Sequence, residues 1–147
     1  MKQIKLNCIL LIDDDEATSF ISNMLLGEAN CTRHIQIAES GRKALVYLSK
    51  SDHCGNEKTV LAYPELIFLD INMPAMSGWG FLGEYKELKN GRHPETVIIV
   101  LTSSINPGDK LKAENIPLVA GFMNKPLTST MIESLIKKYF GNGQVSK

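Results

Sequence analysis

The chain has 147 residues, of which 44% are hydrophobic and 22% charged, and its 16 basic residues balance its 16 acidic ones. This length and composition are those of an ordinary globular protein with a real core, so residues 1–147 are expected to form a single domain. Because the net charge is zero, the sequence has none of the basic excess that is typical of direct nucleic-acid or membrane binding.

Apolar runs are the first sign of the fold. They occur at residues 8–12, 34–38, 65–70, 96–102 and 118–124. The first, third and fourth are apolar throughout rather than alternating, which is typical of parallel strands that are covered on both faces. No run is long enough to span a membrane, and the first is too short for a signal peptide and ends in three acids.

Segments with helical spacing separate these runs. One apolar stripe consists of Ala17, Phe20, Ile21, Met24 and Leu25, and a second, opened by Thr128 as a candidate cap, consists of Ile132, Leu135, Ile136 and Tyr139. The helices predicted at 41–48 and 77–90 are weaker, and 105–117 allows at most a short or irregular helix because it contains two prolines and a glycine. Residues 49–64 are expected to be a polar loop, and 141–147 a frayed tail.

The three cysteines, Cys8, Cys31 and Cys54, are an odd number and are far apart. This pattern favours reduced thiols in a cytoplasmic protein over a disulfide framework or a zinc site. His53 beside Cys54 is more simply explained as part of a polar loop than as half of a metal site.

Strand and helix alternate five times, which predicts an α/β domain with a parallel sheet and right-handed crossovers. Ligands of such sheets bind beyond the carboxyl ends of the strands. The residues found at these ends are Asp13, Asp14 and Asp15 after the first strand, Asp70 and Asn72 after the third, Thr102, Ser103 and Ser104 at the fourth, and Lys125 before Pro126 after the fifth.

Several carboxylates, a hydroxyl and an ammonium are therefore expected at one edge of the sheet. Clustered carboxylates require a shared cation or proton, and an all-oxygen site prefers Mg²⁺. A lysine and a hydroxyl beside Mg²⁺ can clamp a phosphoryl group, and an aspartate can accept one as an acyl phosphate. Taken by itself, the Asp run could be explained by helix capping, and the Thr and Ser residues could be explained as loop residues. Neither explanation accounts for the presence of all these side chains at the ends of neighbouring strands. The residues thus predict Mg²⁺-dependent phosphoryl transfer to or through an aspartate.

Five stretches carry a family resemblance: "ILLIDDDEAT" (9–18), "AESGRKAL" (38–45), "PELIFLDINMPAMSGWGFL" (64–82), "VIIVLTSS" (97–104) and "GFMNKPLT" (121–128). Together they make the chain resemble the receiver domain of two-component response regulators, of the stand-alone, chemotaxis-regulator-like type. The resemblance implies a flavodoxin-like (βα)5 three-layer sandwich with strand order 2-1-3-4-5. It also implies a cytoplasmic monomer or weak dimer, phosphorylated by a sensor histidine kinase or phosphotransfer protein, that signals to a downstream protein without being a turnover enzyme.

The resemblance also assigns roles. Asp70 resembles the phosphoacceptor, Asp13 and Asp14 the acidic pair that holds Mg²⁺, and Asn72 the residue whose backbone carbonyl adds a ligand. Thr102 and Lys125 resemble the hydroxyl and ammonium that contact the phosphoryl group, with a cis Lys125–Pro126 bond, and Asp15 falls at the helix cap. Phe122 stands where many members have a tyrosine switch residue, and Ser77 stands in place of an acid.

Three other functions fit the sequence less well. A haloacid-dehalogenase-type phosphatase needs a second Asp two residues after the nucleophile, where this chain has Asn72. A nucleotide- or flavin-binding protein would have a G-x-G-x-x-G run after the first strand, and this chain has none there. A degenerate receiver scaffold is disfavoured because the set of acids, hydroxyl and lysine is complete.

Overall fold

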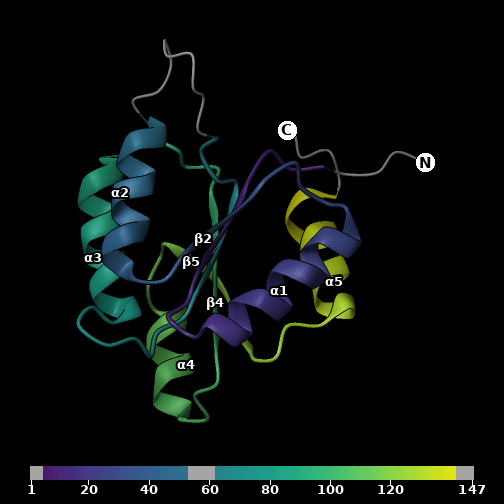
Figure 1. The fold of residues 1–147 in the computed structure, drawn as a ribbon. Helices are drawn as coiled ribbons and strands as arrows, with labels where there is room; N and C mark the ends of the chain where they lie inside the picture. Colours follow the sequence, from purple (N-terminus) through teal and green to yellow (C-terminus); the bar gives the residue numbers. More distant parts are fainter. Residues whose placement is uncertain (1–4, 53–61, 142–147) are drawn as a thin grey trace.

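The computed structural model describes residues 5–52 and 62–141. In these residues strands and helices alternate throughout (Figure 1). In chain order they are β1 (Ile9–Ile12), α1 (Glu16–Ala29), β2 (Ile35–Ala38), α2 (Gly41–Asp52), β3 (Leu66–Leu69), α3 (Gly78–Lys89), β4 (Val97–Thr102), α4 (Pro107–Glu114), β5 (Val119–Asn124) and α5 (Ser129–Phe140). None of the described helices is both long and apolar enough to cross a bilayer.

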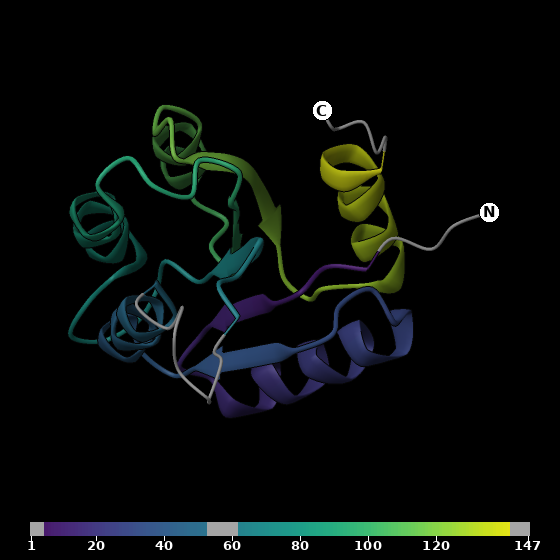
Figure 2. The same cartoon turned by 90° about the horizontal axis from the view of Figure 1, so that it is seen from above.

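The sheet is parallel and has the order β2-β1-β3-β4-β5. Strand β3 lies between β1 and β4, so that Leu69 pairs with Ile12 on one side and Val100 on the other. Figure 2 shows helices on both faces of the sheet, with α1 and α5 on one side and α2 and α3 on the other. The predicted flavodoxin-like sandwich and its strand order are confirmed.

The core forms two layers because alternate residues of each strand point to opposite faces of the sheet. Leu10 and Ile12 of β1 pack with buried residues of α2 and α3, such as Leu48 and Phe81. Ile9 and Leu11 pack on the other side, against α1 and α5. Both faces are buried, which explains why the strand sequences are apolar without alternation.

Helix capping agrees with much of what the sequence predicts. Thr128 caps α5 by accepting a hydrogen bond from the N–H of Met131 (3.1 Å), and Ser77 caps α3 through the N–H of Gly80 (3.2 Å). Residues 105–117 do contain a short helix, because Asn106 caps it and Pro107 lies in its first turn, where proline is tolerated. Asp15 occupies the N-cap of α1, but its carboxylate accepts from the Thr18 hydroxyl (2.6 Å) instead of a helix N–H.

The orientation of α1 differs from what its apolar stripe suggests. Such a stripe ordinarily marks the buried side of a helix, yet Phe20 is 65% exposed, Ile21 48% and Met24 47%. The buried residues are Ser19, Ser22 and Leu26. Of the predicted stripe, only Leu25 packs against the core, together with Ala29. The start of α1 lies against the acidic end of β1, where small polar side chains fit, and this placement turns the larger apolar ones outward.

The predicted boundaries of the loop before β3 are also corrected. Residues 49–52 belong to α2, which runs four residues beyond the predicted helix 41–48. The rest of that loop up to residue 61, with His53 and Cys54, lies outside the described residues. So does the predicted tail, apart from Gly141, which caps α5. Cys8 and Cys31 are buried free thiols.

A polar cluster joins the end of α2 to the connection between α3 and β4. The Asp52 carboxylate is 2.6 Å from both the Arg92 guanidinium and Nε2 of His93, and the His93 ring stacks on Tyr63 at 3.5 Å. The hydrogen bond from His93 is the main cause that holds the pKa of Asp52 below its ordinary value. Because its folded-state pKa is lowered, Asp52 stabilises the fold above the ordinary aspartate pKa, and this contribution is lost as pH falls below about 4.

We expect Asp52→Asn to lower the free energy of unfolding by about 1–3 kcal/mol at neutral pH, because the hydrogen-bonded charge is removed. The difference from the native chain should shrink as the pH falls below about 4. Urea unfolding of both proteins across this range measures the effect. Glu133→Gln, at an exposed carboxylate of α5, is the control. An equal difference at all pH values would contradict the linkage.

Candidate functional site

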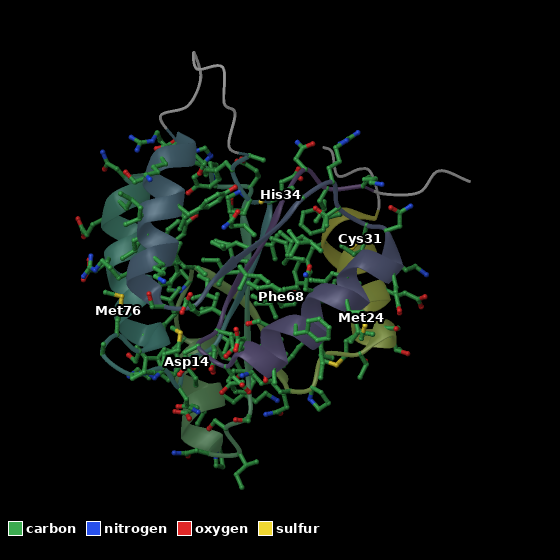
Figure 3. The ribbon with its side chains drawn as sticks, viewed as in Figure 1. Asp14, Met24, Cys31, His34, Phe68 and Met76 are labelled. Atoms are coloured by element: carbon green, nitrogen blue, oxygen red, sulfur yellow. The ribbon has the colours of Figure 1, made fainter. Side chains whose placement is uncertain are left out.

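The site forms where the carboxyl ends of four neighbouring strands meet. Asp13 follows β1, Asp70 follows β3, Thr102 ends β4 and Lys125 comes directly after β5. Asp13, Asp70 and Thr102 are nearly inaccessible to solvent, with 7%, 5% and 0% of their surface exposed. Asp14 is exposed, and Figure 3 shows it at the opposite end of the sheet from His34. The structure therefore brings together the acids, hydroxyl and lysine that the sequence placed at strand ends.

Lys125 joins the two buried carboxylates. Its Nζ lies 2.6 Å from Oδ2 of Asp13 and 3.4 Å from Oδ2 of Asp70. Its backbone N–H donates to the carbonyl of Thr102 (2.8 Å), which continues the pairing of β5 with β4. The Lys125–Pro126 bond is cis, as the resemblance implied. The ammonium thus lies between the strands that supply the acids.

A chain of polar contacts fixes the other oxygen of Asp70 and the Thr102 hydroxyl. Oδ1 of Asp70 accepts a hydrogen bond from the N–H of Asn72 (3.1 Å). The Thr102 hydroxyl accepts from the Asn72 side-chain amide (3.4 Å) and from the N–H of Ser104 (3.2 Å). Because a hydroxyl has one proton and two lone pairs, Thr102 keeps its proton available to donate toward the site.

Burial and charge act in opposite directions on the two ionisable groups in contact. Burial is the main cause that raises the pKa of Asp70, and the nearby charge of Asp13 also raises it, whereas the Asn72 N–H and Lys125 lower it. Burial alone would lower the pKa of Lys125, but its hydrogen bond to Asp13 and the charges of both acids outweigh burial and raise it. Lys125 is therefore held in its charged form, which compensates part of the negative charge of the buried acids.

The acids can also hold a metal ion. Asp13, Asp14 and Asp70 each offer one carboxylate oxygen, and these oxygens lie within 4.8 Å of one another. An all-oxygen set with two or three carboxylates suits Mg²⁺, which keeps several waters and takes few protein ligands. With one ammonium against three carboxylates, the cluster retains negative charge for a divalent cation, so the residues present fit Mg²⁺.

Comparison with known proteins identifies the family. The family model of the response regulator receiver domain matches residues 9–137. The chain belongs to this family. It is 30% identical to the two-component response regulator ARR17 of Arabidopsis thaliana, over 86% of this chain and 80% of that protein. A two-component response regulator structure from Cytophaga hutchinsonii superposes with a TM-score of 0.81, at 29% identity and covering 94% of this chain and 98% of that one.

Receiver domains also occur inside much longer proteins. The chain is 30% identical to hybrid signal transduction histidine kinase L of Dictyostelium discoideum over 92% of its own length, but it spans only 7% of that protein. Similarly, it spans 27% of a probable cyclic di-GMP phosphodiesterase of Vibrio cholerae that it matches at 31% identity. Receiver domains are signalling modules.

Two residues that support the receiver site are not identified by sequence reasoning. Gly78 begins α3, and a Cβ there would lie 2.6 Å from Cα of Ile71 and 2.8 Å from the Asp70 carbonyl oxygen, so a larger residue would push α3 away from the acid. The Asn124 amide donates to the Ser104 carbonyl (2.9 Å) and thereby holds the loop after β4. Asn124 stands in the "NKP" run, a signal that was available, whereas the role of Gly78 is visible only in three dimensions.

Phe122 lies on β5 opposite Val100 of β4. It is half-buried and packs against a small cluster formed by Ile71, Val100 and Ala113, against which Trp79 also packs. Because Val100 and Thr102 are two residues apart on one strand, they point to the same face of the sheet. Phe122, the candidate switch residue, therefore packs beside Val100, the neighbour of Thr102 on the same face of β4.

Proposed function

We propose that this receiver domain accepts a phosphoryl group on a carboxylate oxygen of Asp70 in a Mg²⁺-dependent reaction. The donor is a phosphohistidine of a sensor histidine kinase or phosphotransfer protein. Its N–P bond breaks, an O–P bond to Asp70 forms, and the electron pair returns to the histidine ring. The observation that carries the proposal is the position of Asp70: it is buried at the end of the central strand, with the ammonium of Lys125 3.4 Å from its Oδ2.

Each neighbouring residue has a role in this reaction. Asp13 and Asp14 hold Mg²⁺ with Asp70, and the backbone carbonyl of Asn72 adds a further ligand. When bound, Mg²⁺ neutralises charge on the phosphoryl oxygens. Lys125 stabilises the negative charge of the transferred group, and the Thr102 hydroxyl donates a hydrogen bond to it. The chain does not turn over substrate in this scheme, because the phosphoryl group stays on the protein until it is hydrolysed.

Intact-mass spectrometry after incubation with Mg²⁺ and a small acyl-phosphate donor tests the proposal. We expect the mass of one phosphoryl group to be gained, and to be lost again under mild alkaline conditions that hydrolyse acyl phosphates. A protein that gains no mass with any donor would be a scaffold, and this result would contradict the proposal.

The ligand role of Asp14 gives a separate prediction. We expect Mg²⁺ to bind Asp14→Ala at least about tenfold more weakly than the native chain, since even residues outside the ligand set change metal affinity by this amount. Asp15→Ala should bind Mg²⁺ almost normally, because the Asp15 carboxylate is engaged with the Thr18 hydroxyl at the start of α1. Isothermal titration calorimetry measures both affinities. Equal losses would contradict the assignment of Asp14, as opposed to Asp15, to the metal site.

The donor protein is proposed to dock on the exposed apolar side of α1. Phe20 and Ile37 line a hollow of about 440 Å³ that also contains Asp13 and Asp14, so the exposed apolar surface reaches the site itself. An exposed apolar surface on a soluble protein commonly marks an interaction site.

The buried free thiols Cys8 and Cys31 support a reducing, cytoplasmic setting.

Phe122 is proposed to carry the signal away from the site. The phosphoryl group adds about one and a half to two negative charges, which draw the Thr102 hydroxyl inward and leave space that the Phe122 ring can enter. We expect Phe122 ring resonances to shift between the free and the beryllofluoride-bound protein in NMR spectra, where beryllofluoride stands in for the phosphoryl group. Thr102→Val, which cannot donate the hydrogen bond, should keep the free-state Phe122 resonances. An unchanged Phe122 in the native protein would show that the signal leaves by another route.

A further inference from the structure

A groove lies away from the phosphorylation site, between α3 and the segment that joins α4 to β5. Its volume is about 640 Å³. The apolar part of its lining consists of Trp79 and Leu82 of α3 and of Ile116, Pro117 and Leu118 of the joining segment. Gly83 leaves it open, because a Cβ at this position would meet no atom within 4 Å. No residue of the phosphorylation site lines the groove.

The charged groups around the groove are mostly positive. Lys86 and Lys89 of α3 line it, and the Lys112 ammonium of α4 lies 4.7 Å from the centroid of the Trp79 ring. Within residues 5–52 and 62–141, none of the three lysines forms an ion pair. Glu87 is the one acidic residue among the described residues that line the groove. In a chain with no net charge, three lysines that pair with no acid of the described residues form a local positive excess around an apolar surface.

We propose that this groove binds an acidic, apolar segment of a partner protein. Apolar side chains of that segment would cover Trp79 and Leu82, and its carboxylates would meet Lys86 and Lys112 at the rim. Apolar groups supply most of the affinity of such a contact, while complementary charge supplies orientation and selectivity. The proposal goes beyond phosphoryl acceptance and does not require it, because the groove is lined by other residues than those of the phosphorylation site.

Trp79 connects the groove to the interior and also provides a signal for binding. It is the only tryptophan of the chain. It lines the groove and also packs against the Ile71, Val100 and Ala113 cluster that Phe122 also contacts. A segment seated in the groove would therefore change the surroundings of the one indole and so its fluorescence.

The test uses the full chain and a random peptide library displayed on phage, selected without Mg²⁺ or a phosphoryl donor. Selected peptides are synthesised, and their affinities are measured by the fluorescence of Trp79. The blocking variant is Gly83→Leu, whose side chain extends into the groove from an open helix position. The matched control is Gly27→Leu in α1, where a Cβ likewise meets no atom within 4 Å. Both changes replace a helical glycine with a better helix former, so neither should impair folding.

We expect the selected peptides to be rich in Asp, Glu and large apolar residues. Their affinity should fall by about tenfold or more in Gly83→Leu, a change of about 1.4 kcal/mol, and should be unchanged in Gly27→Leu. Lys86→Glu should weaken the binding of these peptides as well. A selection that yields no binders, basic binders, or binders unaffected by Gly83→Leu would overturn the proposal. Because no phosphoryl donor is present, these outcomes are independent of whether Asp70 accepts a phosphoryl group.

Discussion

The Asp70→Asn variant is expected to gain no phosphoryl group under conditions that phosphorylate the native chain completely. An amide oxygen is a far poorer nucleophile than a carboxylate, and no other described acid combines the burial of Asp70 with contact to Lys125 at the end of the central strand. The fold should persist, because Asn has nearly the same volume and the Lys125–Asp13 pair at 2.6 Å remains. Intact-mass spectrometry gives the extent of phosphorylation, and circular dichroism confirms that the protein is folded.

Asp15→Asn is the matched control for this experiment. Asp15 is an exposed acid two residues beyond Asp13, and its change removes a similar charge from the same end of the sheet. We expect this variant to be phosphorylated as the native chain is. If Asp70→Asn still gained one labile phosphoryl group, the acceptor would be another acid, and the assignment of Asp70 would be wrong.

Replacing Lys125 with Met is expected to have the largest effect on stability. Two buried carboxylates, Asp13 and Asp70, would lose the ammonium that now lies 2.6 and 3.4 Å from them. Breaking a buried ion pair from one side costs about 3 kcal/mol or more, because the remaining charge is left uncompensated. We therefore expect the free energy of unfolding to fall by about this amount at neutral pH. Lys137→Met, at an exposed position of α5, should change it little.

The pH dependence of Lys125→Met gives a second measurement. Burial already raises the pKa of Asp70, and loss of the ammonium should raise it further. An acid whose pKa is higher in the folded than in the unfolded state destabilises the fold above the unfolded pKa. The deficit should therefore shrink as the pH falls through the raised pKa, and Mg²⁺ should also reduce it at neutral pH. A deficit independent of both pH and Mg²⁺ would point to lost packing instead of uncompensated charge.

Much of this structure follows from local sequence rules. Runs such as "LIFLD" predict strands because both faces of a parallel strand are buried, and residues such as Asp70 and Thr102 at their ends must meet because all carboxyl ends share one edge. The strand order was available only through the family resemblance, since periodicity does not say which strands are neighbours. The sequence thus predicted that these residues lie together at one edge of the sheet, as the structure has them.

The remaining features depend on contacts between distant segments. The exposure of Phe20 and Met24 follows from how α1 packs against the end of β1, where Ser19 and Ser22 are buried. The hydrophobic stripe alone predicts that the wrong side of this helix is buried. Gly78 has its role because the Asp70 carbonyl comes close to the start of α3. Such close approaches leave no periodic signal in the sequence, so they were not predictable from it.

The position of Lys125 after the last strand has a consequence for synthesis of the chain. A ribosome completes Asp13, Asp14 and Asp70 well before Lys125, so an unfinished chain carries the acids without their counter-charge and without the β5 edge of the sheet. Domains generally fold as units once their sequence has emerged. A nascent receiver thus cannot bring the Lys125 ammonium between Asp13 and Asp70 until most of the domain has been translated.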